Sequence, residues 1–187
     1  GHSKTSGNYL MKFFTALVFI LLSTFWCSVT TASELIVVDD NGAEVRLAQP
    51  AKRIISLAPN ITEVLFHIGA GEQIVGADEY SNYPLQAKDI QRVSNYAAAN
   101  YELILSLKPD LVIAWQSGNG DKIINPLRKL GIPVFVVETA EIGEVPNLFR
   151  RFGALSGQDK TAEQRALEFT ERLKKLRMAN AKKSSVR

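Results

Sequence analysis

The sequence predicts an α/β fold: an open, mostly parallel sheet with helices on both faces, followed by a long C-terminal helix. Three observations support this prediction. Short apolar runs alternate with helical patterns after Pro50. One of these runs, Leu111–Trp115, is apolar throughout, as expected of a strand that helices cover on both sides. The segment Asp159–Ala181 keeps a single helical pattern for more than twenty residues.

Composition limits the possible functions before any motif is considered. The chain has 187 residues, 46% of them hydrophobic and 22% charged, which is an ordinary globular composition. The net charge is +3, but Lys4 and Lys12 precede Ser33 with no acidic residue beside them, and the remainder has 20 basic residues against 19 acidic ones. This near-neutral body predicts no nucleic-acid partner. The one cysteine, Cys27, also precedes Ser33, which excludes a disulfide, a thiolate metal site and a cysteine nucleophile from the body.

Residues 1–32 are predicted to be a leader with a cleavable signal peptide, which places the rest of the protein in the periplasm. Lys12 supplies a charged start, Phe13–Trp26 is almost wholly apolar, and Thr30–Ala32 offers small residues for cleavage. The apolar run is shorter than the ~20 residues that span a bilayer. Two alternatives stay open: a buried core helix, and a lipid anchor at Cys27, which the bulky residues before it disfavour.

An N-terminal α/β lobe is predicted over residues 33–156, and it begins with a β-hairpin. Leu35–Val38 and Ala43–Leu47 are β-prone runs on either side of Asn41-Gly42, a dipeptide that is typical of hairpin turns. After the hairpin, Arg53–Ala58 is predicted to be a buried strand.

The helix after this strand is expected to be capped by Asn60, because Glu63 three residues later would complete a capping box. Gly69 is expected to end the helix in a left-handed conformation. Ile74–Ala77 is the next predicted strand, and Asp78–Gln86 is predicted to be a loop because it is rich in Asp, Asn, Tyr and Pro.

The pattern then repeats. Asn100 is expected to cap a short helix over Tyr101–Leu107, and the Leu111–Trp115 strand follows. Asp121–Leu130 is predicted to be helical, with Pro126 marking either a kink or the first true turn.

The last strand of the lobe is predicted at Pro133–Val137 and its last helix at Glu144–Leu155. Residues 157–187 are predicted to form the long helix. Its apolar stripe is Ala162, Ala166, Phe169, Leu173 and Leu176. Its basic end is interpreted as a solvated helix terminus, with an anion- or membrane-binding patch as the alternative. Because so long a helix usually connects two units, we expect this chain to be an N-terminal portion whose second lobe is absent.

Motifs of catalysis are missing from the sequence. There is no G-x-S-x-G elbow and no P-loop, and the body has a single histidine, His67. Gly69–Gly71 follows a helix and precedes a strand, the reverse of what phosphate binding requires. The acidic cluster of Glu138, Glu141 and Glu144 is interpreted as solvated loop charge. The sequence therefore predicts that the protein is not an enzyme and has no metal site.

Aromatic residues follow three strands of the predicted sheet. Tyr80 lies in the loop after Ile74–Ala77, Tyr96 follows Val93, and Trp115 ends its own strand. The carboxyl ends of parallel strands meet at one edge, where ligands gather in such sheets. We therefore predict an aromatic-lined cleft for a large, flat ligand, the alternative being that the rings only cap the core.

Several blocks of this sequence resemble one family. These blocks are Pro50–Glu63, followed by Leu65, Gly69 and Ile74–Gly76, then Glu79–Pro84 and Leu107–Trp115. Together they resemble the periplasmic binding proteins for iron chelates and vitamin B12, and they are most similar to the cobalamin-binding members. The resemblance runs from about Lys52 to the C-terminus.

This resemblance implies two α/β lobes joined by one rigid helix, with cobalamin or a related corrinoid held between them and delivered to the permease of an inner-membrane ABC importer. It implies ligand contacts for Tyr80 and Trp115. A further pocket tryptophan of the family matches Tyr96, which keeps a ring of a different shape. Glu102 matches a surface glutamate that docks on the permease. No resident cofactor is implied, since cobalamin is the transported ligand.

Two alternatives remain open. The same fold could carry haem, with Tyr80 on the iron, or an iron–siderophore complex, although Arg92 is the one arginine near the candidate loops. A secreted hydrolase on a flavodoxin-like sheet would need a nucleophile and a base, and His67 is the one histidine that could serve as that base.

Overall fold

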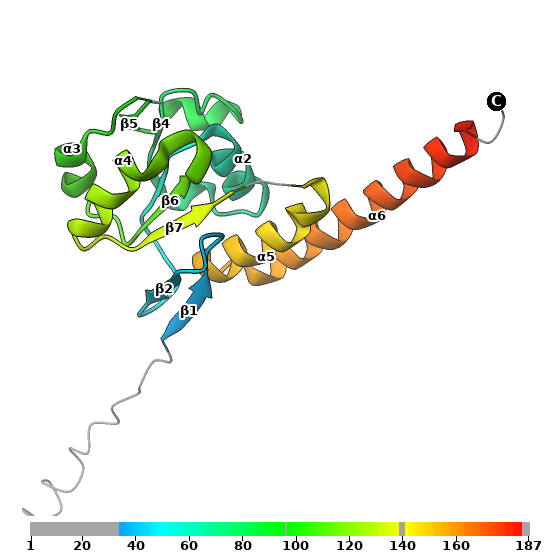
Figure 1. Cartoon of the computed structure of the whole chain (residues 1–187), viewed down its shortest axis with the longest axis horizontal. Coiled ribbons are helices and arrows are strands. Elements are labelled where there is room, and N and C mark those ends of the chain that lie inside the picture. Colours follow the sequence, from blue (N-terminus) through cyan, green and yellow to red (C-terminus); the bar gives the residue numbers. More distant parts are fainter. Residues whose placement is uncertain (1–33, 96, 139–140, 185–187) are drawn as a thin grey trace, which may run out of the picture. The chain divides into compact units, whose positions relative to one another are not determined.

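The computed structural model describes residues 34–95, 97–138 and 141–184, and the predicted leader lies outside them. Five parallel strands form a sheet in the order β5-β4-β3-β6-β7 (Figure 1). The strands are β3 (Ile54–Ser56), β4 (Ile74–Asp78), β5 (Arg92–Ser94), β6 (Leu111–Trp115) and β7 (Val134–Val137). The prediction of an open parallel sheet is therefore confirmed.

Helices cover both faces of this sheet (Figure 1). They are α2 (Pro59–His67), α3 (Tyr101–Ser106), α4 (Gln116–Lys129), α5 (Val145–Ser156) and α6 (Asp159–Ser184). The helices α2, α5 and α6 pack with Ile113 and Phe135 in one core, whereas α3 and α4 pack with Val112 and Val136 in the other. Successive residues of β6 and β7 thus enter opposite cores, which explains why both strands are apolar throughout.

The predicted hairpin is present and consists of β1 (Leu35–Val38) and β2 (Glu44–Leu47), which pair antiparallel. The buried carboxylate of Asp39 accepts two backbone N–H groups within the turn, at 2.9 and 2.8 Å. The next residue, Asp40, donates its N–H to the carbonyl of Val136 at 3.0 Å. The turn is thereby fastened to the edge strand β7.

The expected capping of α2 by Asn60 is wrong. The helix begins one residue earlier, at Pro59, and its N-cap is Ala58, with no side-chain cap. Proline has no N–H to leave unpaired and its φ is already helical, so it starts a helix without a capping side chain. The other end agrees with expectation, because Gly69 follows the helix with a φ of +88°.

The helix α4 begins at Gln116, earlier than the predicted Asp121. Its first turn is separated from the rest by Gly120, whose φ of 63° and ψ of 172° are not helical. The bend therefore lies at this glycine, while Pro126 sits inside the helix. A proline leaves the carbonyl four residues earlier without a helical partner. That carbonyl, of Lys122, instead accepts the hydroxyl of Tyr101 from α3 at 3.3 Å.

The long helix α6 is one continuous element of 26 residues, as predicted. It lies along α5, where Gly153 allows close approach to Ala162 and Arg150 makes two hydrogen bonds to Glu163 at 2.6 and 3.1 Å. Figure 1 shows that α6 continues beyond α5, and nearly all of its described side chains after Phe169 are exposed. Within the described part of the chain, no helix combines the length and apolar character needed to cross a membrane.

Candidate ligand-binding edge

Two of the three predicted ligand contacts lie at the same edge of the sheet. Tyr80 follows the carboxyl end of β4 by two residues, and Trp115 is the last residue of β6. Only β3 separates these two strands. Both side chains are accessible, with exposed fractions of 53% and 36%. The third residue, Tyr96, lies outside the described residues, although β5, which it follows, ends at the same edge.

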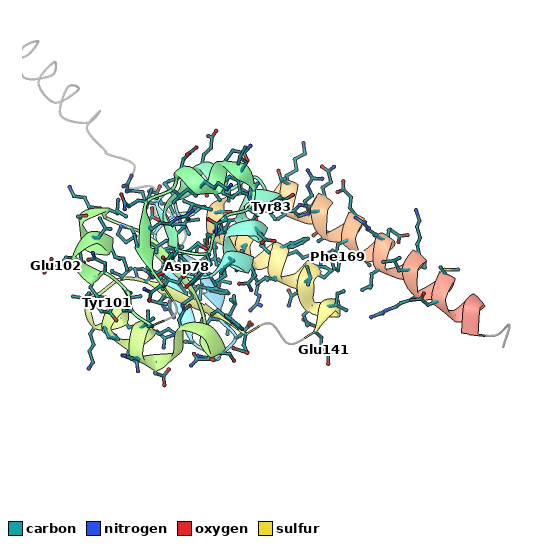
Figure 2. The ribbon with its side chains drawn as sticks, turned by 90° about the horizontal axis from the view of Figure 1, so that it is seen from above. Asp78, Tyr83, Tyr101, Glu102, Glu141 and Phe169 are labelled. Carbon is teal, nitrogen blue, oxygen red and sulfur yellow. The ribbon has the colours of Figure 1, made fainter. Side chains whose placement is uncertain are left out.

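Tyr83, in the same loop as Tyr80, lines a different space. It borders a groove of about 620 Å³ on the α2 side of the molecule, together with His67, Phe149 and Phe169. Figure 2 shows Tyr83 on this side, between Asp78 and Phe169. Neither Tyr80 nor Trp115 borders this groove.

The turn that carries Tyr80 is held by Asp78. The carboxylate of Asp78 accepts the backbone N–H of Tyr80 at 2.8 Å, and the backbone carbonyl of Asp78 accepts the N–H of Ser81 at 3.1 Å. Arg92 donates to the same carbonyl at 3.2 Å. Burial raises the pKa of the Asp78 carboxyl, although the hydrogen bond from Tyr80 and the charge of Arg92 act against this. A buried acceptor therefore fixes the turn.

A cluster of buried hydroxyls supports the same turn from below. The hydroxyl of Thr62 on α2 lies 2.8 Å from that of Ser56 on β3 and 2.9 Å from that of Ser81. All three side chains are fully buried. Buried polar groups cost free energy unless they are paired, so this network favours one position of the Ser81 backbone and of the neighbouring Tyr80.

The Trp115 ring rests on the first turn of α4. A methyl group at Gly118 would overlap the indole ring, so the ring lies directly against this glycine. The side chain of Asn119 accepts the backbone N–H of Trp115 at 2.8 Å and donates to the carbonyl of Leu57 at 2.9 Å. Sequence analysis missed Asn119 because its second partner lies far away along the chain.

The β7 side of the edge carries an ion-paired network. Glu138 accepts the N–H and the hydroxyl of Ser117 at 2.9 and 2.6 Å, and its own N–H donates to Asp40 at 2.7 Å. Asp40 also pairs with Arg151 of α5. Glu138 is thus a half-buried loop charge with specific hydrogen-bond partners, whereas Glu141 and Glu144 are exposed as expected.

Glu102 occupies the first turn of α3 and is exposed. The predicted cap is confirmed, because the Asn100 side chain accepts the N–H of Leu103 at 3.0 Å. Figure 2 shows Glu102 at the periphery of the lobe, on the side opposite Phe169. A carboxylate in the first turn interacts favourably with the helix dipole. Its accessibility makes it available to a macromolecular partner.

His67 is the last residue of α2 and lies against α5. Its ring contacts that of Phe149, with the centroids 5.2 Å apart. Burial, assisted by the charge of Arg165, lowers the pKa of this histidine, and Glu168 opposes the shift. Among the described residues, no group of three or more His, Cys, Asp or Glu side chains is placed to hold a metal ion.

Comparison with known proteins agrees with this architecture. The family model described as "Periplasmic binding protein" matches residues 54–186. The vitamin B12-binding protein of Vibrio cholerae is 38% identical over 138 residues, covering 74% of this chain and 50% of that protein. The corresponding protein of Yersinia pestis is 36% identical over 130 residues, or 70% of this chain and 46% of the relative. This chain thus spans about half the length of these relatives.

Solved structures give the same result. The crystal structure of the periplasmic vitamin B12-binding protein of Vibrio cholerae matches with a TM-score of 0.68 and 39% identity, over 71% of this chain and 52% of that one. A periplasmic haem-binding protein from Pseudomonas aeruginosa matches with a TM-score of 0.64 and 23% identity, covering 72% and 49%, which shows a shared fold alone. From its sheet order, its helix-covered core and these matches, the chain belongs to the periplasmic binding protein family.

Proposed function

We propose that this chain is part of an extracytoplasmic solute-binding protein that captures cobalamin between two lobes and delivers it to an inner-membrane ABC permease. One observation carries the proposal: Tyr80 and Trp115 stand accessible at the same sheet edge, on strands that flank β3. The relatives that share 36–38% identity with the chain are named vitamin B12-binding proteins, which supports the choice of ligand.

The proposed organisation has three parts. Residues 1–32 are the leader that directs export to the periplasm, residues 33–156 are the N-terminal lobe, and residues 157–187 form the helix between the lobes. The exposure of α6 beyond Phe169 supports a role in joining a second unit. The relatives, about twice as long as the matched segment, supply the length for such a unit.

The chemistry of the edge suits a corrinoid. Aromatic faces pack against a flat macrocycle, and a tyrosine hydroxyl pairs with its polar periphery. If Tyr80, Tyr96 and Trp115 each bury roughly 100 Å² of apolar surface, the gross gain is about 7 kcal/mol. Association costs about 4–15 kcal/mol. One lobe alone therefore binds weakly, and tight capture needs contacts from a second lobe.

Delivery requires no chemical step on the ligand. The proposed partner is the permease, which Glu102 would contact through a cationic surface. An exposed charge of this kind orients docking more than it adds affinity. Capture and delivery, in place of turnover, is the proposed task of the protein, and it requires no resident cofactor.

The test is a titration of the chain with cyanocobalamin, followed by calorimetry and by corrin absorbance. We expect a dissociation constant in the micromolar range or weaker, further weakened by Tyr80→Ala and by Trp115→Ala. Tyr83→Ala is the matched control. It removes an exposed tyrosine from the same loop, and this tyrosine borders the groove on the α2 side.

Two results would contradict the proposal. Nanomolar binding by the isolated chain would show that no second lobe is needed. A Soret shift with hemin, combined with no response to cyanocobalamin, would assign the edge to haem.

A further inference from the structure

We infer that Asn119 is a positioning residue, and that it belongs to a hydrogen-bonded brace that fixes the spacing between Trp115 and Tyr80 across β3. The inference rests on the proposed function for the roles of the two rings. The brace itself is a property of the described side chains.

The brace begins at Trp115. The backbone N–H of Trp115 donates to the side-chain oxygen of Asn119 at 2.8 Å. The side-chain nitrogen of Asn119 donates to the carbonyl of Leu57 at 2.9 Å. Leu57 directly follows β3, so one asparagine joins the carboxyl ends of β6 and β3. Asn119 is buried, which makes the loss of either bond costly.

The brace continues from β3 to the Tyr80 turn. The carbonyl of Ala58, next to Leu57, accepts the hydroxyls of Ser56 and Thr62 at 3.2 and 3.4 Å. The Thr62 hydroxyl then lies 2.9 Å from that of Ser81, beside Tyr80. The two sets of hydrogen bonds are joined by the backbone between Leu57 and Ala58, and together they link the two ring-bearing segments.

Two glycines allow the Trp115 end to form. Gly118 has no side chain where the indole ring lies, and Gly120 takes a positive φ of 63° that separates the first turn of α4 from the rest of the helix. Both glycines therefore suit the position that the Trp115 ring takes against the first turn of α4.

A fixed spacing has a direct consequence for binding. Side chains that are already ordered lose less conformational entropy when a ligand arrives. A large planar ligand that touches both rings benefits most, since a small shift of either one would open a gap. The brace therefore holds the two segments that carry the rings in place before a ligand arrives.

The first test needs no ligand. In a Trp26→Phe background, Trp115 is the sole tryptophan, so the fluorescence of the protein reports how accessible the Trp115 ring is to solvent. We expect Asn119→Ala and Gly118→Ala to shift the emission to the red and to raise the acrylamide quenching constant. The controls Asn147→Ala and Gly143→Ala, at an exposed asparagine and an uncrowded glycine, should leave both unchanged. Unchanged quenching in folded Asn119→Ala would overturn the inference.

The second test separates the two ends of the brace. Asn119→Asp keeps an acceptor for Trp115 but loses the donor to Leu57, and Thr62→Val breaks the path at the Tyr80 end. Each should weaken cyanocobalamin binding about fivefold, the fold-change expected for one lost hydrogen bond. Thr62→Val should do so without altering Trp115 quenching. Wild-type affinity in both folded variants would overturn the inference.

The outcomes also distinguish this inference from the proposed function. If the chain gives no response to cyanocobalamin, the ligand assignment fails, while the ligand-free quenching of Asn119→Ala still decides whether the brace exists. Circular dichroism identifies any variant that does not fold, and Gly118→Ala then provides the independent reading.

Discussion

The backbone N–H of Tyr80 donates to the carboxylate of Asp78 at 2.8 Å, directly where β4 ends. A buried carboxylate is an expensive acceptor, because burial disfavours its charged form. An asparagine oxygen could accept the same hydrogen bond without this cost. The relationship therefore links the turn that presents Tyr80 to the pH of the solution.

Asp78→Asn should raise the free energy of unfolding at neutral pH. Burial raises the folded-state pKa of the Asp78 carboxyl, and it outweighs the backbone hydrogen bonds from Tyr80 and Glu79, which lower that pKa. A raised folded pKa means that the folded state binds the proton more tightly, so the stability that Asp78 contributes is present at low pH and is lost as the pH rises through that pKa. Urea unfolding at about pH 7 and about pH 4, on either side of the usual Asp range, should show the advantage of the variant shrinking on acidification. An advantage that grows in acid would contradict this.

Tyr101→Phe should destabilise the protein by about 0.5–1.5 kcal/mol, because the Lys122 carbonyl loses its partner. Pro126→Ala supplies a new helical N–H to the same carbonyl. The cost of Tyr101→Phe should therefore fall in the Pro126→Ala background, which a double-mutant cycle of urea unfolding measures. Strictly additive effects would show that the two groups do not share the carbonyl.

Gly153→Ala should destabilise the packing of α6 on α5. The added methyl group would overlap the Cβ of Ala162, and overpacking costs about 1–3 kcal/mol. Higher helix propensity returns up to ~1 kcal/mol. Thermal unfolding should thus show a lower midpoint, whereas Gly143→Ala, where no atom lies within 4 Å of the new methyl, should change little. An unchanged midpoint for Gly153→Ala would indicate that the two helices are free to separate.

His67→Gln should reduce the loss of stability on mild acidification. Burial and Arg165 lower the folded-state pKa of His67, against the opposing charge of Glu168. The unfolded state then binds the proton more tightly, so stability is lost as the pH falls below ~6.5. Unfolding free energies at about pH 7.5 and about pH 5.5, either side of the ordinary histidine value, should differ more in the wild type than in the variant. Equal differences would exclude His67 as the titrating group.

Glu102→Lys should weaken docking to the permease of the proposed importer by at least ~10-fold, because like charges brought together cost several kcal/mol. Binding to importer reconstituted in vesicles is the measurement, and the loss should fade as salt is added. Glu72→Lys is the control, since it reverses the charge of an exposed glutamate at the amino-terminal ends of the strands. Glu72 lies in a short 3₁₀ turn that precedes β4. Equal losses in both variants would point to net charge instead of a specific contact.

Most of the fold follows from local patterns in the sequence. The continuous apolar runs at β6 and β7 predict a sheet buried on both faces, and Asn100 and Gly69 mark helix ends through interactions within one turn. The Asn60 cap failed because a proline immediately before it starts the helix first. Each of these features depends on residues that are close along the chain.

The candidate site is only partly predictable for the same reason. The positions of Tyr80 and Trp115 after their strands predict a shared edge, since strand direction alone decides it. The role of Asn119 depends on Leu57, 62 residues away, and no local pattern contains that contact. The Glu138 network likewise depends on Asp40, 98 residues earlier in the chain.

The periodicity of α6 sets a strict geometric rule for anything attached to its far end. Each residue of an α-helix advances about 1.5 Å and turns by about 100°. A single insertion after Phe169, beyond which nearly all described side chains are exposed, would hardly change the reach of the helix but would rotate an attached module by about 100°. In the proposed two-lobe protein, the number of residues in this segment would set which face of the second lobe turns towards Tyr80 and Trp115, so insertions and deletions here should be far more harmful than substitutions.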